Sequence, residues 1–315
     1  MTSDISIDPA PGRVCPVRYR YDPGAVARAP ERSVETLYVI GGLYGNLQAL
    51  DEIDTMSAAE PGPVKLCFNG DFNWFNVDDA GFRAINERAL LHDAILGNVE
   101  AELGETTASA GCGCAYPESV DQGTVERSNR IHAVLKQTAA RHPDILARLG
   151  GLPMVARYRV GALRIGVVHG DAEALAGWRF DVAALDDPLE QGWRAAAFAA
   201  ATVDVFASSH TCLPATRRFD FGGPKLVANN GAAGMPNALG KKFGIATRIG
   251  IGPSPHPALY GSKLHGVSID ALPVRYDAAR WEEEFLNNWP EGSAAWKSYF
   301  ARIAKGPEFR LQNSV

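Results

Sequence analysis

The run VKLCFNGD (residues 64–71) determines how we interpret the rest of the chain. It is a short apolar run that ends in a glycine and a carboxylate, which is typical of a strand covered on both faces. Three later runs also end in a polar residue at a turn: AILGN (94–98), LRIGVVHG (163–170) and VDVFASSH (203–210). Ligands of such sheets bind outside the carboxyl ends of the strands. We therefore expect four side chains to converge there: Asp71, Asn98, His169 and His210.

These four residues offer one carboxylate, one amide oxygen and two imidazoles. This combination of ligands suits a divalent transition metal such as Mn²⁺, Fe²⁺ or Zn²⁺. We predict all four as metal ligands, and Asp71, His169 and His210 also as catalytic residues.

The composition narrows the class of protein. The chain has 315 residues and 46% hydrophobic content, which suits one large α/β domain or two smaller ones. A net charge of −5 argues against nucleic acid as the main partner. The five cysteines are too few and too scattered for a secreted disulfide framework. With no apolar signal segment in the first 33 residues and no long apolar run, we expect a cytoplasmic protein without a membrane partner.

Strand and helix patterns alternate from residue 37 onward, which predicts a parallel or mixed sheet with helices on its faces. We divide the chain into an extended N-terminal arm (1–33), a main domain (34–276) and a C-terminal helical extension (277–315). Residues 105–124 break the periodic pattern and are predicted to be a loop insertion. The strands after residue 213 lie close together, and we expect them to form a second, largely antiparallel set.

Six short blocks resemble, in order and spacing, those of the calcineurin-like metallophosphoesterase superfamily, in particular its small bacterial phosphodiesterase branch. The resemblance covers about residues 36–277 and implies a four-layer α/β/β/α sandwich of mixed sheets with the site at the strand ends. The blocks are GGLYGN (41–46), NGD (69–71), LGNVE (96–100), VVHGD (167–171), SSHTC (208–212) and NNGAAG (229–234).

The resemblance also implies a chemistry. In the family, two metals share a carboxylate and a hydroxide between them attacks phosphorus. This chain keeps all the ligands of one metal, whereas three ligands of the other are replaced by Gly42, Tyr44 and Cys212. Val99 stands where the family has the histidine that protonates the leaving oxygen, and loss of such an acid lowers the rate by about 10²–10⁴. We predict a divergent phosphoric ester hydrolase that uses a metal-bound hydroxide at a single-metal site, without a second ion.

The positions of these blocks also predict residues that bind the substrate or orient a ligand. We expect substrate contacts from Asn98, from Asn73 and from the backbone N–H of Gly42, because a glycine turn before a helix can bind an anion. Tyr44 is predicted to donate its hydroxyl to the substrate; the alternative is that its ring fills the space of the lost metal. Asp171 is expected to orient His169.

The cysteines allow a different metal site. Cys212 is predicted as a metal ligand, and with Cys112 and Cys114 it would form a thiol-rich site that selects zinc or iron. The alternative is that all three are free thiols, since C-x-C lacks the usual spacing of zinc ligands.

Three functions remain open from the sequence. The first is a hydrolase of a small phosphorylated substrate. The second is a catalytically impaired protein of the same fold that acts as a ligand-binding or assembly module. The third is a repurposed enzyme with a cysteine-containing metal site. The aromatic stripe of the C-terminal extension is expected to pack internally and leaves homo-oligomerisation open.

Overall fold

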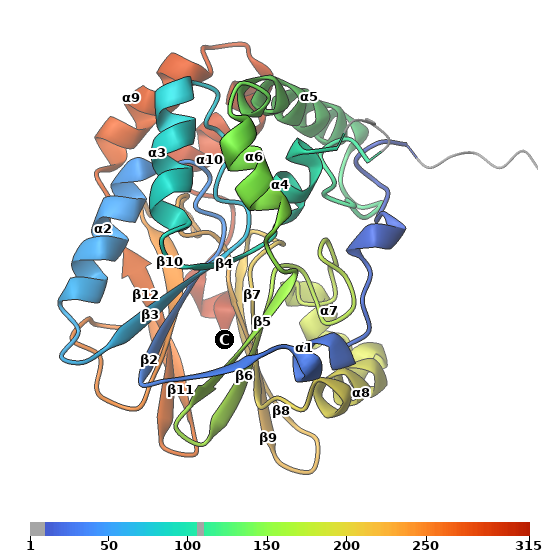
Figure 1. Cartoon of the computed structure of the whole chain (residues 1–315), viewed down its shortest axis with the longest axis vertical. Coiled ribbons are helices and arrows are strands. Elements are labelled where there is room, and N and C mark those ends of the chain that lie inside the picture. Colours follow the sequence, from blue (N-terminus) through green and yellow to red (C-terminus); the bar gives the residue numbers. More distant parts are fainter. Residues whose placement is uncertain (1–9, 106–109) are drawn as a thin grey trace, which may run out of the picture.

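The computed structural model describes residues 10–105 and 110–315. Two six-stranded sheets pack face to face, and helices cover both outer faces (Figure 1). The predicted four-layer α/β/β/α sandwich is confirmed. Residues 1–9 of the predicted arm and 106–109 of the predicted insertion lie outside the described residues. None of the helices in the described part of the chain is long and apolar enough to cross a membrane.

The first sheet has the strand order β11-β12-β10-β2-β3-β4. Strands β2, β3 and β4 run parallel, and β10, β11 and β12 continue the sheet by antiparallel pairing. The bounds are β2 Thr36–Ile40, β3 Val64–Asn69, β4 Asp93–Ile95, β10 Gly244–Gly250, β11 Tyr260–Leu264 and β12 Val267–Val274.

The second sheet has the order β1-β5-β6-β7-β9-β8 and is also mixed. Strands β6, β7 and β9 are parallel neighbours, whereas β5 with β6 and β8 with β9 form antiparallel pairs. The late strands were predicted as one antiparallel set, and this is wrong: β8 and β9 join the second sheet, while β10 to β12 join the first. Local periodicity shows that a strand forms but carries no information about its partner. The bounds are β1 Glu31–Val34, β5 Val155–Val160, β6 Leu163–Val168, β7 Val205–Ser208, β8 Pro214–Asp220 and β9 Pro224–Asn230.

Alternation along β2 shows how the layers are filled. Leu37 and Val39 point between the sheets, where they join a core that includes Ile165 of β6. Tyr38 and Ile40 point to the other face and pack under the outer helices. Because successive side chains point to opposite faces and both faces are covered, the strand is apolar throughout.

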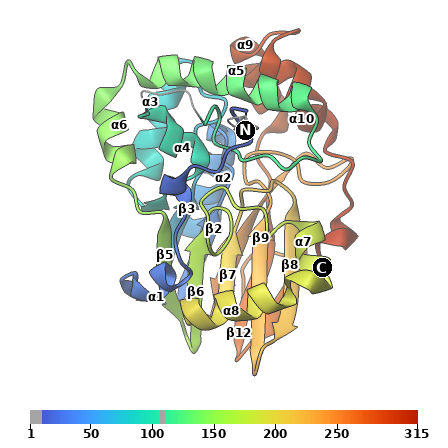
Figure 2. The same cartoon turned by 90° about the vertical axis from the view of Figure 1, so that its right-hand side faces the viewer.

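Helices α2, α3 and α9 cover the first sheet, α1, α7 and α8 cover the second, and α5 and α6 lie together at one end of the sandwich (Figures 1 and 2). Asn46 caps α2 by accepting a hydrogen bond from the Ala49 N–H at 2.9 Å. Pro143 stands at the first position of α6, where proline is favoured because its missing N–H would have no partner in the helix. The bounds are α1 Gly24–Arg28, α2 Leu47–Ala58, α3 Asp79–Ala89, α4 Asn98–Leu103, α5 Gln122–Ala139, α6 Pro143–Gly150, α7 Val182–Asp186, α8 Gln191–Ala201, α9 Ala278–Asn288 and α10 Ala301–Lys305.

The described parts of the predicted arm and of the predicted extension pack against the sandwich. Within the predicted arm, Tyr19 and Val26 are buried, and β1 pairs with β5 at the edge of the second sheet. Near the other end, Trp281 and Phe285 of α9 are buried against Phe75. The division of the chain into arm, domain and extension stays a prediction.

Candidate metal centre

The four polar residues at the strand ends come from both sheets. Asp71 follows β3 and Asn98 begins α4 just after β4, whereas His169 follows β6 and His210 follows β7. All four are buried, and the structure brings them together. Asp71 has a φ of 53°, a left-handed conformation that is uncommon for non-glycine residues and that aspartate tolerates better than most.

The contacts centre on His169. Its Nε2 atom lies 3.3 Å from Asp71 Oδ2, 3.2 Å from Asn98 Oδ1 and 3.2 Å from His210 Nδ1. One ligand atom each from Asp71, His169 and His210 lies within 4.8 Å of the other two. The cluster is therefore compact enough for a single ion to reach all of these atoms.

Backbone carbonyls fix which atom of each ring faces the cluster. His169 donates from Nδ1 to the Asn69 carbonyl at 2.7 Å, and His210 donates from Nε2 to the Cys114 carbonyl at 3.1 Å. A carbonyl only accepts, so these nitrogens carry the protons and the opposite nitrogens present lone pairs to the cluster. Two imidazole lone pairs beside a carboxylate are the environment that a divalent cation requires, so the residues fit a metal.

A proton can compete with a metal ion for the lone pairs of the two histidine rings. Burial alone would lower the pKa of His169, but the adjacent Asp71 carboxylate outweighs it and raises that pKa. Burial, together with the neighbouring His169, lowers the pKa of His210 to about 3. The two rings therefore do not both become charged, and metal binding displaces at most the proton shared between His169 and Asp71.

Glu100 holds the turn that carries Asp71. Its buried carboxylate accepts hydrogen bonds from the backbone N–H groups of Asp71 at 2.7 Å, Phe72 at 3.1 Å and Asn73 at 3.2 Å, and from the Gly97 N–H at 3.3 Å. Burial and the nearby Asp71 charge raise the pKa of Glu100 to about 7. Glu100 thus fixes the position of a ligand without facing the cluster itself.

Comparisons with known proteins agree with this architecture. A metallophosphoesterase from Sphaerobacter thermophilus superposes with a TM-score of 0.54 at 15% identity, over 86% of this chain and 100% of that chain. A hypothetical protein from Pyrococcus horikoshii OT3 superposes with a TM-score of 0.58 at 16% identity, over 87% of this chain and 99% of that chain. The chain has the metallophosphoesterase fold. No family model and no curated protein matches the sequence.

Within this metallophosphoesterase fold, the three replaced ligand positions pack against one another. A Cβ atom on Gly42 would lie 2.9 Å from Cε2 of the Tyr44 ring, so that ring occupies the space of a side chain at position 42. The Tyr44 hydroxyl lies 2.8 Å from Cys212 Sγ. This geometry supports the interpretation that Tyr44 fills the place of the lost metal.

Three predicted contacts are corrected by the structure. The Gly42 N–H donates to the Gly70 carbonyl at 3.3 Å, so it does not face an anion. The Asn73 amide is fully buried and bonds Glu100 and Asn86, which removes it from any substrate. Asp171 accepts from backbone N–H groups of its own loop, and the Asn69 carbonyl orients His169 instead.

The cysteines lie near the cluster but do not join it. Cys114 and Cys212 border the same cavity as Asp71, whereas Cys112 packs in the apolar core. In the described part of the chain, the one group that meets the geometry for a metal contains no cysteine. Burial raises the pKa of both the Cys114 and the Cys212 thiol, which opposes thiolate formation. Ligation by Cys212 stays a prediction.

The cavity beside the cluster is small and largely aromatic. Its volume is about 40 Å³, and its walls include Trp74, Tyr116, Trp178 and Tyr299. A buried water needs at least about 10–15 Å³ by such a measure, so the cavity suits an ion with a few waters rather than a phosphoester. The described residues that line it include no lysine or arginine. Sequence patterns gave no signal for Tyr116 or Trp178, and Tyr299 lies in the stripe attributed to packing.

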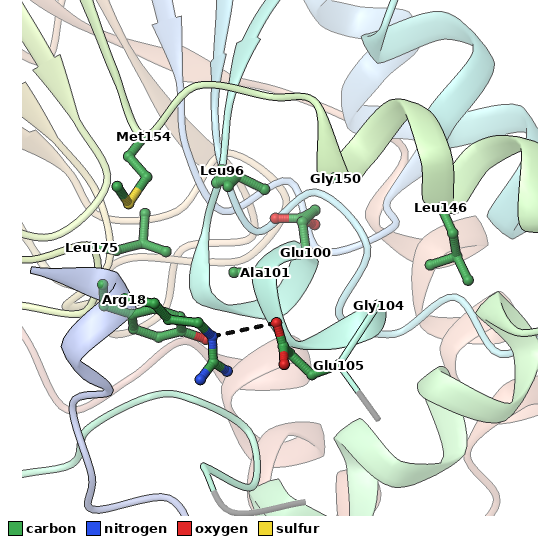
Figure 3. Close-up of a pocket in the computed structure, with 11 residues that line it drawn as sticks. Arg18, Leu96, Glu100, Ala101, Gly104, Glu105, Leu146, Gly150, Met154 and Leu175 are labelled. Carbon is green, nitrogen blue, oxygen red and sulfur yellow. Dashed lines mark ion pairs between the residues drawn. The ribbon is translucent and has the colours of Figure 1, made fainter. Parts of the chain in front are cut away.

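A separate, larger cavity of about 300 Å³ lies next to Glu100 (Figure 3). Leu96, Met154 and Leu175 contribute apolar walls, and Arg18 pairs with Glu105 at 3.4 Å. None of the four candidate ligands lines this cavity. Glu100 and Tyr19 border it and contact the metal centre only at backbone atoms, of Asp71 and Asn98 respectively, so the 40 Å³ cavity, which three of the candidate ligands line, is the candidate reaction site.

Proposed function

We propose that this protein is a phosphoester hydrolase that uses a single divalent transition metal, Mn²⁺, Fe²⁺ or Zn²⁺. Asp71, Asn98, His169 and His210 hold the ion. The observation that carries the proposal is the pair of ring nitrogens, His169 Nε2 and His210 Nδ1, which face each other beside the Asp71 carboxylate. Each is fixed in that role by a backbone carbonyl on the opposite side of its ring.

The choice of one ion follows from the neighbouring positions. Gly42 provides no ligand, and the Tyr44 ring lies where its side chain would extend. The Cys212 thiol bonds the Tyr44 hydroxyl and the His210 carbonyl. In this proposal, protein atoms fill the place of the second ion that the resemblance implies.

When bound, the ion would lower the pKa of a coordinated water and polarise a phosphoryl oxygen. The Asp71 carboxylate is held in place by its hydrogen bond from the Val99 N–H at 3.1 Å. Burial, with Cys212 and Asp71 nearby, raises the pKa of Tyr44 well above its ordinary value, so its hydroxyl stays neutral beside Cys212 Sγ and offers no negatively charged ligand to a metal. The Val99 side chain supplies no proton, so good leaving groups are favoured.

A second candidate function has its own support. The 40 Å³ cavity suits an ion with a few waters, and the described residues that line it include no lysine or arginine to bind a phosphoester. A protein that holds a metal without turnover would have the same lining. We therefore retain a non-catalytic, metal-holding module as the alternative.

An activity assay separates the two. Purified protein would be loaded with Mn²⁺, Fe²⁺ or Zn²⁺ and assayed on bis- and mono-p-nitrophenyl phosphate. His169→Ala removes a ligand, and His265→Asn is the control, because His265 is exposed in the β11–β12 turn with a φ of 47° that asparagine tolerates. Turnover lost only in His169→Ala supports the hydrolase. Metal bound without turnover supports the module, and equal turnover in all three proteins contradicts the proposed site.

A further inference from the structure

The turn around Cys112 and Cys114 contacts two of the four candidate ligands through its backbone. Asn98 donates from Nδ2 to the Cys112 carbonyl at 3.0 Å, which turns its Oδ1 atom toward His169. His210 donates from Nε2 to the Cys114 carbonyl at 3.1 Å, which turns its Nδ1 atom toward the cluster. Two carbonyls, two residues apart, therefore orient half of the ligand set.

Gly113 separates these two carbonyls and has little freedom to change. Its φ is 68°, a conformation that side-chain-bearing residues rarely adopt. A Cβ atom there would lie 2.6 Å from the Tyr19 hydroxyl oxygen and 2.9 Å from Glu102 Cγ. Glycine is thus required both by the backbone and by the close approach of two buried side chains.

The turn is also anchored from three other parts of the chain. The Cys112 N–H donates to Asn129 Oδ1 of α5 at 3.0 Å, and the Trp178 indole donates to the Cys114 carbonyl at 3.0 Å. The Tyr116 N–H donates to the Gly12 carbonyl at 2.9 Å. These bonds hold the carbonyls in place independently of the ligands that they contact.

We propose that residues 112–114 are a positioning element of the metal centre and act chiefly through two carbonyl oxygens. The inference rests on the proposed metal site. The Cys112 thiol packs in the apolar core, and the Cys114 thiol accepts only a longer hydrogen bond, at 3.4 Å, from the same Asn98 amide that donates to the Cys112 carbonyl at 3.0 Å. Groups that hydrogen-bond metal ligands from behind typically contribute 10- to 100-fold to metal affinity.

The test measures the dissociation constants of Zn²⁺ and Co²⁺ by chelator competition, together with the visible spectrum of the Co²⁺ protein. Gly113→Ala is expected to weaken binding about 10- to 100-fold and to alter the Co²⁺ spectrum. Gly222→Ala is the control, because Gly222 has a similar φ of 74° in the exposed β8–β9 turn, but a Cβ atom there would meet no neighbour within 4 Å. The double variant Cys112→Ser/Cys114→Ser keeps both carbonyls, and the Ser hydroxyl at position 114 can still accept from the Asn98 amide as Cys114 Sγ does, so it is expected to bind like the wild type.

The outcomes distinguish this inference from the proposed function. Wild-type protein that binds no metal overturns both. Wild-type binding with an unchanged affinity in Gly113→Ala overturns the positioning role alone, as does a loss in the double cysteine variant that equals that of Gly113→Ala. If Gly113→Ala does not fold, Asn129→Ala replaces it, since it removes the anchor of the Cys112 N–H but touches no ligand; an affinity equal to wild type then overturns the inference.

Discussion

His169 Nε2 lies 3.2 Å from His210 Nδ1, and each ring donates its other nitrogen to a backbone carbonyl. Two lone pairs at this distance repel unless a cation or a proton lies between them. The Asp71 carboxylate, 3.3 Å from the same His169 atom, adds a negative charge to the site. The cluster therefore needs a positive charge between these atoms, which either a proton on His169 or a metal ion can supply.

Restoring the family's ligands at positions 42, 44 and 212 should create a second metal site. In the triple variant Gly42→Asp/Tyr44→His/Cys212→His, the Tyr44 ring no longer fills the space beside position 42, and three ligands return. We expect the bound metal to rise from one to two ions per chain, measured by elemental analysis. Gly42→Asp alone would collide with the Tyr44 ring and should still bind one ion. A triple variant that folds and still binds one ion would refute the interpretation that the Tyr44 ring fills the place of the second metal.

Glu100 should matter for stability because its carboxylate accepts four backbone N–H groups. Glu100→Gln replaces one acceptor oxygen by an NH₂ donor that faces those groups. We expect a loss of about 2 kcal/mol in the free energy of unfolding, measured in urea. Glu105→Gln, on the same part of the chain but half-exposed, should change it by less than about 0.5 kcal/mol. Equal effects of the two substitutions would show that the Glu100 network contributes little.

Tyr299 should limit access to the cavity. Its ring lines the cavity, and Tyr299→Ala removes this wall. If the protein is a hydrolase, we expect kcat/KM for bis-p-nitrophenyl phosphate to rise about tenfold, equivalent to about 1.4 kcal/mol. Trp296→Ala is the control, since Trp296 belongs to the same helical turn but stacks on Phe300 instead of lining the cavity. A rate that rises equally in both variants would point to general loosening rather than to access.

Acid stability should depend on a buried ion pair far from the site. Burial would raise the pKa of Glu60, but hydrogen bonds from Arg248 and Tyr38 outweigh it and lower that pKa. A carboxyl with a lowered pKa in the folded state stabilises the protein at neutral pH, and this contribution is lost as the pH falls through the folded pKa.

Glu60→Gln should therefore cost about 3 kcal/mol at pH 7, because the buried Arg248 guanidinium keeps two backbone carbonyls but only the more distant Asp270, at 3.8 Å, as a described carboxylate partner. The difference from wild type should begin to shrink as the pH falls below about 4.3, the ordinary pKa of glutamate in the unfolded chain, and should continue to shrink through the lower pKa of Glu60 in the folded protein. Unfolding curves from pH 3 to 7 measure this, with the exposed Glu87→Gln as control. A difference that does not change with pH would exclude the ion pair as its cause.

The fold could be predicted because its information is local and ordered along the chain. Runs such as 64–71 are apolar on both faces and end in a turn, and the blocks between residues 41 and 234 occur in the order of a known architecture. The meeting of Asp71 with His169 and His210 followed from the general position of ligands at strand ends. Strand partners across the two sheets could not be predicted, because they depend on long-range packing.

The surroundings of the site were predicted less well. Asn73 and Asp171 have side chains that suit a site, but their hydrogen bonds turn them to Glu100 and to their own loop. The turn at Cys114 orients His210 through a backbone carbonyl. Every residue has such a carbonyl, so the residue type gives no signal of this role. Trp178 reaches the cavity from a loop without any periodic pattern. The identity of a side chain predicts which hydrogen bonds or metal bonds it can form, whereas its neighbours in the fold determine which of them it forms.

Metal stoichiometry tests the central claim most directly. Protein purified without chelators and loaded with Mn²⁺, Fe²⁺ or Zn²⁺ should carry one ion per chain by elemental analysis. The ion should be absent from Asp71→Ala and His169→Ala variants that remain folded. Zero ions in the loaded wild-type protein, two ions per chain, or an unchanged ion in both variants would contradict the account.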